Sequence, residues 1–208
     1  MKPLKKVRSY SDFTLQHLRE LLGINNHRHA LNLLQQPIEP TDWLKITLEK
    51  NKAAPINSEK ARSELLITPI LIELLTRNPQ KFNYFSGNTF DVEPLQALKG
   101  RCDFLLTKQL SLDITAPIIT VFEAKDDNID NWYGQCGAEM YAARLFNERH
   151  NEPYRIIHGA VTDGYQWIFL RLEESMLWVD TERYYLHDLS GLLGVLQNVI
   201  DFYNATSS

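Results

Sequence analysis

The sequence predicts an α/β domain in which one mixed β-sheet is flanked by helices. Three observations support this fold class: a long helical pattern at residues 58–77, short β-like runs between residues 82 and 125, and helical patterns at 131–148 and 189–203 with more strands between them. Helices interspersed with strands in this way cover a sheet. At 208 residues, the chain has the length of one ordinary domain.

The N-terminal segment is predicted to be a helical cap on this domain. Four leucines recur at helical spacing, Leu15, Leu18, Leu21 and Leu22, and Ala30 to Leu34 forms a second short helix after the polar loop INNHRH. Thr41 stands at the N-cap of a further helix that ends at about Lys50. We therefore expect a helical extension at residues 1–55 and the main domain at residues 56–208.

The main domain is predicted to begin with a long helix. Asn57 or Ser58 caps the segment SEKARSELLITPILIELLTR, whose leucines and isoleucines recur at helical spacing. Pro69 lies inside this pattern and should kink the helix, because proline lacks the backbone N–H that the preceding turn needs.

Short strands follow this helix. FNYFS and NTFDVE are predicted as two strands joined by a turn at Ser86-Gly87, and RCDFLLT and IITVFEAK follow them in a largely antiparallel meander. The run from Ile118 to Phe122 is apolar without alternation, as expected for a central strand covered on both faces. After the helix at 131–148, we expect strands at IIHGAVT and QWIFLRL and an edge pair near 176–185.

Composition favours a cytoplasmic protein that does not cross a membrane. No apolar stretch approaches the roughly 20 residues of a membrane span, and the N-terminus lacks the features of a secretory signal. The two cysteines, Cys102 and Cys136, fit a reducing compartment. The net charge of −4 gives no sign of a broad nucleic-acid-binding surface; the basic stretches Lys2 to Arg8 and Lys45 to Arg62 are either phosphate contacts or solvated faces.

The segment GRCDFLLTKQLSLDITAPIITVFEAKDD carries the residues that suggest chemistry. Alternation in a strand places Glu123 and Lys125 on one face, at the end of the most apolar strand, where charge is costly to bury unless it is paired. Asp103 interrupts the preceding apolar strand. If the two strands are neighbours, Asp103, Glu123 and the carbonyl of Ala124 offer oxygen ligands suited to Mg²⁺, and Lys125 can orient or deprotonate the attacking water.

A bland interpretation is that Glu123 and Lys125 form an ion pair at a strand end while Asp103 is a surface carboxylate. Isolated ExK triplets are common, and most have no catalytic role. Three features coincide here and favour a metal site: the acid in the preceding apolar strand, the apolar lead-in to Glu123, and the helix that follows Lys125.

The pattern resembles the PD-(D/E)xK nuclease superfamily, which has the fold of restriction endonucleases, and in particular small uncharacterised cyanobacterial-type proteins of that fold. The resemblance covers about Ser58 to Tyr203 through SEKARSELLITPILIEL, FSGNTFDVE, GRCDFLL, TVFEAK and GQCGAEMYAARLFNE. It implies a nuclease that acts on nucleic acid, with DNA expected, and that uses Mg²⁺ or Mn²⁺. Many members act as dimers, so a homodimer is also an expectation.

The resemblance also assigns roles to individual residues. Asp103 and Glu123 would be metal ligands and Lys125 the catalytic lysine. The helical acid of the family, a third metal ligand, falls on Glu64 or Glu59, and Glu64 is preferred. The glutamine of the second helix falls on Gln135, with Glu139 one turn further on the same face.

Two rival functions remain open: a binding module for nucleic acid or protein that keeps the fold without turnover, and a structural subunit that docks through its N-terminal helices. Other candidate residues are weaker. His27 and His29 are expected in a surface loop without metal partners, Cys136 as a small buried residue, and Trp167 and Phe169 as core residues that do not stack on bases.

Overall fold

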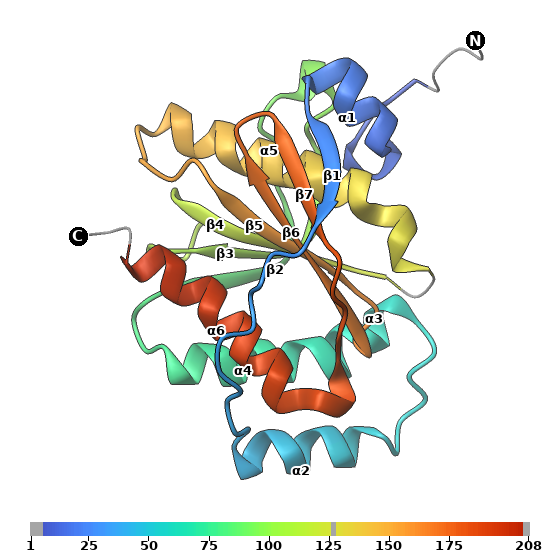
Figure 1. The fold of residues 1–208 in the computed structure, drawn as a ribbon, viewed down its shortest axis with the longest axis vertical. Coiled ribbons are helices and arrows are strands. Elements are labelled where there is room, and N and C mark those ends of the chain that lie inside the picture. The colour runs from blue at the N-terminus through green and yellow to red at the C-terminus, as the bar shows by residue number, and fades with distance from the viewer. Residues whose placement is uncertain (1–5, 126–127, 206–208) are drawn as a thin grey trace.

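The centre of the fold is one mixed, eight-stranded sheet in the order β1-β7-β6-β5-β4-β3-β2, with the short β8 paired to β6 (Figure 1). The computed structural model describes residues 6–125 and 128–205. Two neighbouring pairs are parallel, β1 with β7 and β4 with β5, and the others are antiparallel. The strands are β1 Asn25–His29, β2 Asn83–Thr89, β3 Arg101–Thr107, β4 Ile118–Ala124, β5 Ile157–Thr162, β6 Gln166–Glu173, β7 Met176–Asp180 and β8 Tyr184–Tyr185.

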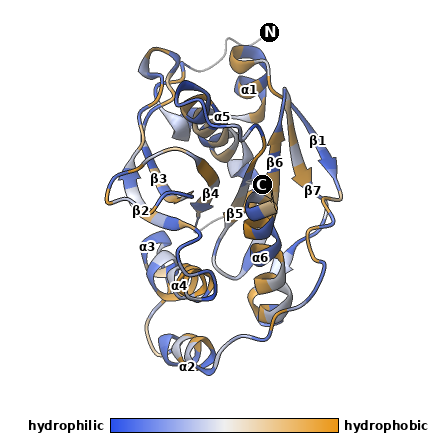
Figure 2. Cartoon of the chain, turned by 90° about the vertical axis from the view of Figure 1, so that its left-hand side faces the viewer, coloured by the Kyte–Doolittle hydropathy of each residue, from blue (hydrophilic) through white to orange (hydrophobic). Residues whose placement is uncertain are grey.

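Helices cover both faces of this sheet. In Figure 1, α1 and α5 lie on one side, while α4 and α6 lie on the other with α2 outside them. Figure 2 shows hydrophobic residues concentrated on the central strands and on α4, as expected for strands buried on both faces. The helices are α1 Leu15–Leu22, α2 Asp42–Asn51, α3 Glu59–Arg62, α4 Thr68–Arg77, α5 Tyr133–Arg149 and α6 Leu189–Ala205.

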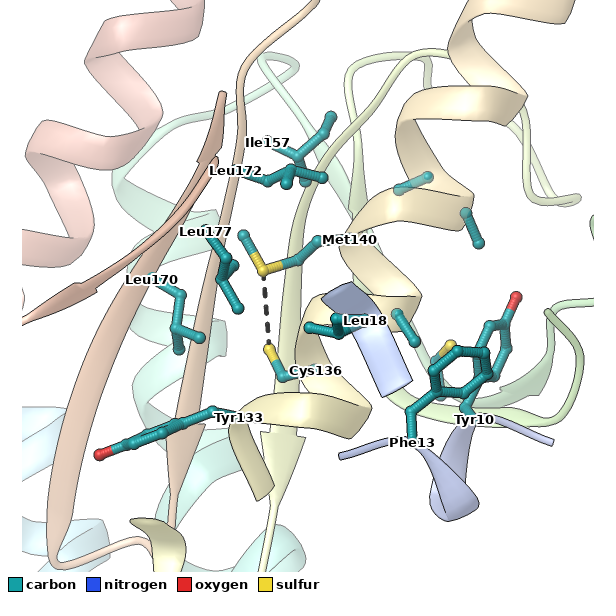
Figure 3. Packing of buried hydrophobic residues seen from close by; sticks show 14 of the residues in the cluster. Tyr10, Phe13, Leu18, Tyr133, Cys136, Met140, Ile157, Leu170, Leu172 and Leu177 are labelled. Carbon is teal, nitrogen blue, oxygen red and sulfur yellow. Dashed lines mark hydrogen bonds between the residues drawn. The ribbon is translucent and has the colours of Figure 1, made fainter. Parts of the chain in front are cut away.

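Helix α5 is fixed against the sheet by close packing and by one polar clasp. Figure 3 shows Cys136 and Met140 of α5 among leucines of β6 and β7, with Leu18 of α1 beside them. Asn147 accepts a hydrogen bond from the Ile118 N–H and donates one to the Ile118 carbonyl, both of 2.7 Å. Because these contacts tie α5 to the start of β4, they set the position of residues further along both elements.

A π-helical segment, Ser63–Ile67, joins α3 to α4 in one continuous helical stretch. Pro69 follows this wide turn and supplies no N–H to it, and the Leu65 carbonyl accepts a hydrogen bond of 2.7 Å from the Asn51 side chain instead. The expected disturbance near Pro69 therefore takes the form of a π segment, which inserts extra backbone into a helix.

Most predicted elements are confirmed, and four local predictions are wrong. The strands at residues 176–185 are not an edge pair, because β7 lies between β1 and β6 while β8 pairs with β6. The polar segment 25–29 is not a loop but the edge strand β1, because its backbone pairs with β7 while its side chains stay largely exposed. Residues 30–34 form no helix. Ser86-Gly87 is not a turn: β2 runs through it as one strand, and Gly87 adopts a φ of 67° that glycine tolerates.

The N-terminal segment is integrated with the rest of the chain, since β1 belongs to the same sheet as the strands of residues 56–208. The division at residue 55 stays a prediction. Residues 2–5 of the first basic stretch lie outside the described residues. Over residues 6–125 and 128–205, none of the helices has the length and apolar character needed to cross a bilayer.

Candidate active site

The charged end of β4 is buried. Glu123 is 1% exposed and Lys125 is 7% exposed, and Lys125 Nζ lies 2.5 Å from Glu123 Oε1. This contact agrees with the strand alternation that placed both side chains on one face. Since either charge would be costly to bury alone, each stabilises the other.

Asp103 lies beside this pair on the neighbouring strand. The register of β3 and β4 pairs Phe104 with Phe122, which brings Asp103 alongside Glu123. Asp103 Oδ2 accepts a hydrogen bond of 2.8 Å from the Ala124 N–H, so its carboxylate is held against the end of β4. The fold thus brings together an acid from one strand with an acid and a lysine from the next.

Helix α5 adds two more polar side chains behind Glu123. Gln135 Nε2 donates to Glu123 Oε1 at 2.5 Å and to Glu139 Oε1 at 3.1 Å. Gln135 is 5% exposed and Glu139 is 0% exposed. Three buried oxygen atoms in this group, Glu123 Oε2, Gln135 Oε1 and Glu139 Oε2, have no hydrogen-bond partner within residues 6–125 and 128–205, which is unusual for buried oxygens and points to a functional site.

Burial and charge set the protonation of this cluster. Burial raises the pKa of Glu123 well above its ordinary range, and the neighbouring charges of Glu139 and Asp103 raise it further against the opposing effect of Lys125. Burial also raises the pKa of Glu139 to about 7, partly offset by its close contacts with the Glu123 carboxyl and the Gln135 amide. For Lys125, burial lowers the pKa, but the attraction of Glu123 outweighs it and the net pKa is raised. Lys125 is therefore an ammonium at neutral pH.

Of the two candidate helical acids, Glu59 lies closer to the cluster. Glu59 Oε2 is 3.7 Å from Lys125 Nζ, whereas Glu64 Oε1 is 3.7 Å from Lys60 Nζ and its side chain is 62% exposed. Both acids line a cleft of about 450 Å³ that also contains Asp103. The geometry favours Glu59 over the preferred Glu64 as the acid that acts with Lys125.

The cluster offers a metal ion two carboxylates and no preassembled cage. Among the described residues, no group of three or more His, Cys, Asp or Glu side chains is arranged to hold a metal ion, so the expected set of Asp103, Glu123 and Glu64 is not assembled. Mg²⁺, however, is commonly held by one or two carboxylates and keeps several waters. Asp103 and Glu123 supply two such carboxylates, and the buried Glu123 Oε2 accepts no hydrogen bond from the part of the chain that the structure describes.

The sequence patterns did not indicate Trp132, whose ring lies beside the cluster. Lys125 Nζ lies 4.4 Å from the centroid of the Trp132 ring, a cation–π contact that holds the ammonium in place. The available signal was the position of Trp132 directly before the helix that carries Gln135.

The contacts of the weaker candidate residues indicate structural roles for them. His27 and His29 lie in β1 with their rings 6.0 and 5.5 Å from the Trp178 ring. The Cys136 thiol is buried beside Met140, and burial raises its pKa, so it is not an activated nucleophile. Trp167 and Phe169 are fully buried, as predicted for core residues.

No known family model matches the chain, and no curated protein matches it. We therefore infer the function from the geometry of the cluster at the end of β4.

Proposed function

We propose that the protein is a metal-dependent nuclease with a restriction endonuclease-like fold, which hydrolyses phosphodiester bonds of nucleic acid, with DNA as the expected substrate. The observation that carries the proposal is the buried Glu123–Lys125 pair at the end of β4. Asp103 lies alongside it, in the cleft. If the Glu123–Lys125 pair were purely structural, the nearby carboxylates of Asp103 and Glu139 would only destabilise it. Both repel the Glu123 carboxylate, and both must be desolvated to lie beside it. Strongly perturbed groups of this kind cluster at functional sites.

The surroundings of Lys125 support a defined role. Hydrolysis joins the oxygen of water to phosphorus and breaks one P–O ester bond, with a proton passing to the departing oxygen. Lys125 keeps its proton because its pKa is raised. It is therefore suited to orient the attacking water and to stabilise negative charge on the phosphate oxygens, more than to act as a base.

Asp103 and Glu123 would hold Mg²⁺ or Mn²⁺, and the bound ion would supply positive charge next to the phosphate. Arg101 and Lys60 line the cleft with Asp103. These two cations are suited to attract a nucleic-acid backbone in spite of the net charge of −4.

The test is cleavage of end-labelled DNA and RNA, single-stranded and duplex, with Mg²⁺ or Mn²⁺. We expect cleavage by the natural protein and a loss of at least about 100-fold in Lys125→Met and in Asp103→Asn. Lys81→Met is the matched control, because Lys81 is exposed and lies outside the cleft. Failure to cut any of these substrates with either ion, or full activity in Lys125→Met, would contradict the proposal.

A matched pair of variants distinguishes the helical acids. Glu59→Gln should reduce cleavage strongly, because Glu59 lies 3.7 Å from Lys125 Nζ. Glu64→Gln should have a smaller effect, because Glu64 is largely exposed and pairs with Lys60. The opposite order would restore Glu64 as the preferred acid.

A binding module without turnover is the second candidate. One observation favours it: Glu123 is already occupied by Lys125 and Gln135, and the described residues hold no three-ligand group. Binding of nucleic acid that is unaffected by Lys125→Met, together with the absence of cleavage, would support this alternative.

A further inference from the structure

A second hollow, of about 690 Å³, opens next to the helical segment that lines the cleft. Its floor is apolar and includes Leu48 of α2, Leu66 of the π segment and Leu189 at the start of α6. The volume lies within the usual range for sites that hold a small organic group. We call this hollow the tyrosine cavity, after Tyr165 and Tyr185 in its lining.

Strand pairing brings the two tyrosines of the cavity together. Gln166 of β6 pairs with Tyr185 of β8, and the Leu186 N–H donates a hydrogen bond of 2.8 Å to the Tyr165 carbonyl. The two residues are 46% and 39% exposed. One face of the Tyr185 ring already stacks on His187, with the ring centroids 5.2 Å apart. The other face of Tyr185 and the exposed ring of Tyr165 are suited to stack on a flat, apolar-faced ligand in the apolar hollow.

The charges of the tyrosine cavity are balanced. Lys45 and Lys52 line it together with Glu49 and Asp163, and Lys52 Nζ lies 2.5 Å from Glu49 Oε2. This lining does not concentrate positive charge, so it does not favour a phosphate group in the interior. An uncharged planar group with polar edges, such as a nucleobase, fits the mixture of aromatic, apolar and polar side chains better.

The tyrosine cavity is one helical turn from the proposed active site. Glu59 and Arg62 are three residues apart on α3 and so are neighbours on its surface. Glu59 lies 3.7 Å from Lys125 Nζ. The Arg62 guanidinium lies 5.9 Å from the centroid of the Tyr165 ring, and it is 3.9 Å from Asp163. Arg62 does not line either hollow, but it contacts Tyr165 of the tyrosine cavity and lies in the same short helix as the cleft residues Glu59 and Lys60. Helix α3 therefore links the two hollows.

We infer that the tyrosine cavity binds an unpaired nucleobase of the strand whose backbone lies in the cleft, with Tyr165 or Tyr185 stacked on the base. This inference depends on the proposed function and names its substrate class: nucleic acid that is single-stranded or locally unpaired. In duplex DNA the faces of a base are covered by its neighbours, so a paired base cannot enter without being unstacked.

The test is binding of a short fluorescein-labelled oligothymidylate, measured by fluorescence anisotropy in EDTA so that no cleavage occurs. We expect Tyr165→Ala or Tyr185→Ala to raise the Kd about fivefold to a hundredfold, the range for loss of one stacked base. The corresponding Phe variants keep the ring and should bind nearly as the natural protein does. Trp43→Ala is the matched control, because Trp43 is an exposed aromatic of α2 that does not line the cavity.

Three results would overturn the inference: unchanged binding in both Ala variants, equal affinity for the oligonucleotide annealed to its complement, or equally strong binding of thymidine monophosphate, which would make the cavity a site for free nucleotides. The outcome is separable from that of the proposed function. Tyrosine-dependent binding without cleavage in Mg²⁺ or Mn²⁺ keeps the inference and removes the nuclease. Cleavage with unchanged binding in the tyrosine variants does the reverse.

Discussion

Replacing Lys125 with methionine should destabilise the protein in a manner that depends strongly on pH. The change keeps the aliphatic length of the side chain but removes the ammonium that lies 2.5 Å from the buried Glu123 carboxylate. Glu123 must then stay buried as an unpaired charge, at a cost of about 3–5 kcal/mol, or take up a proton. The carboxyl has an ordinary pKa of 4.5, so protonation at pH 7 costs about 3.4 kcal/mol, which limits the loss.

We therefore expect Lys125→Met to lower the free energy of unfolding by about 3 kcal/mol at pH 7 and by less than about 1 kcal/mol at pH 4.5. The sign follows from linkage: the pKa of Glu123 is already raised in the natural protein, and loss of Lys125, whose charge lowers it, raises it further. The extra loss of stability in the variant is therefore small at low pH and grows as the pH rises through the folded-state pKa of Glu123. The assay is urea unfolding in EDTA, followed by tryptophan fluorescence at both pH values.

Two control variants test whether Lys125 stabilises a buried carboxylate. Lys81→Met removes an exposed lysine and should change stability by less than about 0.5 kcal/mol. The double variant Glu123→Gln, Lys125→Met removes both charges and should recover most of the loss. An equal loss at pH 7 and pH 4.5, or a double variant no more stable than Lys125→Met, would show that the lysine does not stabilise a buried carboxylate.

Three further predictions concern the scaffold. Burial, with a smaller contribution from Arg171, lowers the pKa of His158 from 6.5 to about 3, so His158 should destabilise the fold as the pH falls below 6.5. Between pH 7.5 and 4.5, His158 should lower the free energy of unfolding by about 2.6 kcal/mol. In urea unfolding, the His158→Gln variant should not show this part of the acid destabilisation. A Cβ at Gly134 would lie 2.4 Å from the Thr14 Cα, whereas one at Gly137 would meet only leucine side chains; Gly134→Ala should therefore give the larger drop in melting temperature. Asn147→Leu leaves the Ile118 N–H and carbonyl without their partner and should cost about 2–5 kcal/mol in urea unfolding.

Each of these three predictions would be contradicted by a specific result. A pH slope in His158→Gln equal to that of the natural protein would mean that other groups control acid stability. A Gly137→Ala variant less stable than Gly134→Ala would show that the backbone at residue 14 yields more easily than packed leucines. A neutral Asn147→Leu would show that the start of β4 finds other hydrogen-bond partners.

The local sequence was sufficient to predict the helices with a clear capping residue and the strands with a clear apolar pattern. Thr41 and Ser58 cap their helices through side-chain oxygens that accept backbone N–H groups, as expected. The mostly apolar run from Ile118 to Phe122 in β4, in which Thr120 is the one polar residue, correctly indicated a central strand, because a strand covered on both faces lacks regular polar alternation.

The sequence did not reveal β1 or the continuity of β2. β1 is an edge strand whose side chains are mostly exposed, and Figure 2 shows it as hydrophilic along its length. Its place is fixed by backbone pairing with β7, about 150 residues later in the chain, and side-chain hydropathy does not record such pairing. Ser86-Gly87 resembled a turn because glycine with positive φ is more common in turns than inside strands.

The site was predictable to the extent that it depends on neighbouring strands. Asp103, Glu123 and Lys125 meet because β3 and β4 are consecutive and antiparallel. The choice between Glu59 and Glu64 was not predictable in the same way. Helical spacing assumes a regular turn, but Glu64 lies within the π segment, whose wider turn changes the face on which Glu64 emerges relative to Glu59.

The π segment at Ser63–Ile67 separates α3, which carries Glu59 and Arg62, from α4, whose apolar side packs in the core. A residue added to a regular helix rotates the chain beyond it by about 100°, and the wide turn at Ser63–Ile67 absorbs such a rotation, so α3 and α4 keep nearly one helical phase across it. Removing one residue from this segment would therefore give a regular helix in which Glu59 and Arg62 nearly keep their places while the apolar stripe of α4 stays packed. A deletion within α3 just after Glu59 meets no wide turn, so it would rotate Glu59 away from Lys125 in a protein that still folds.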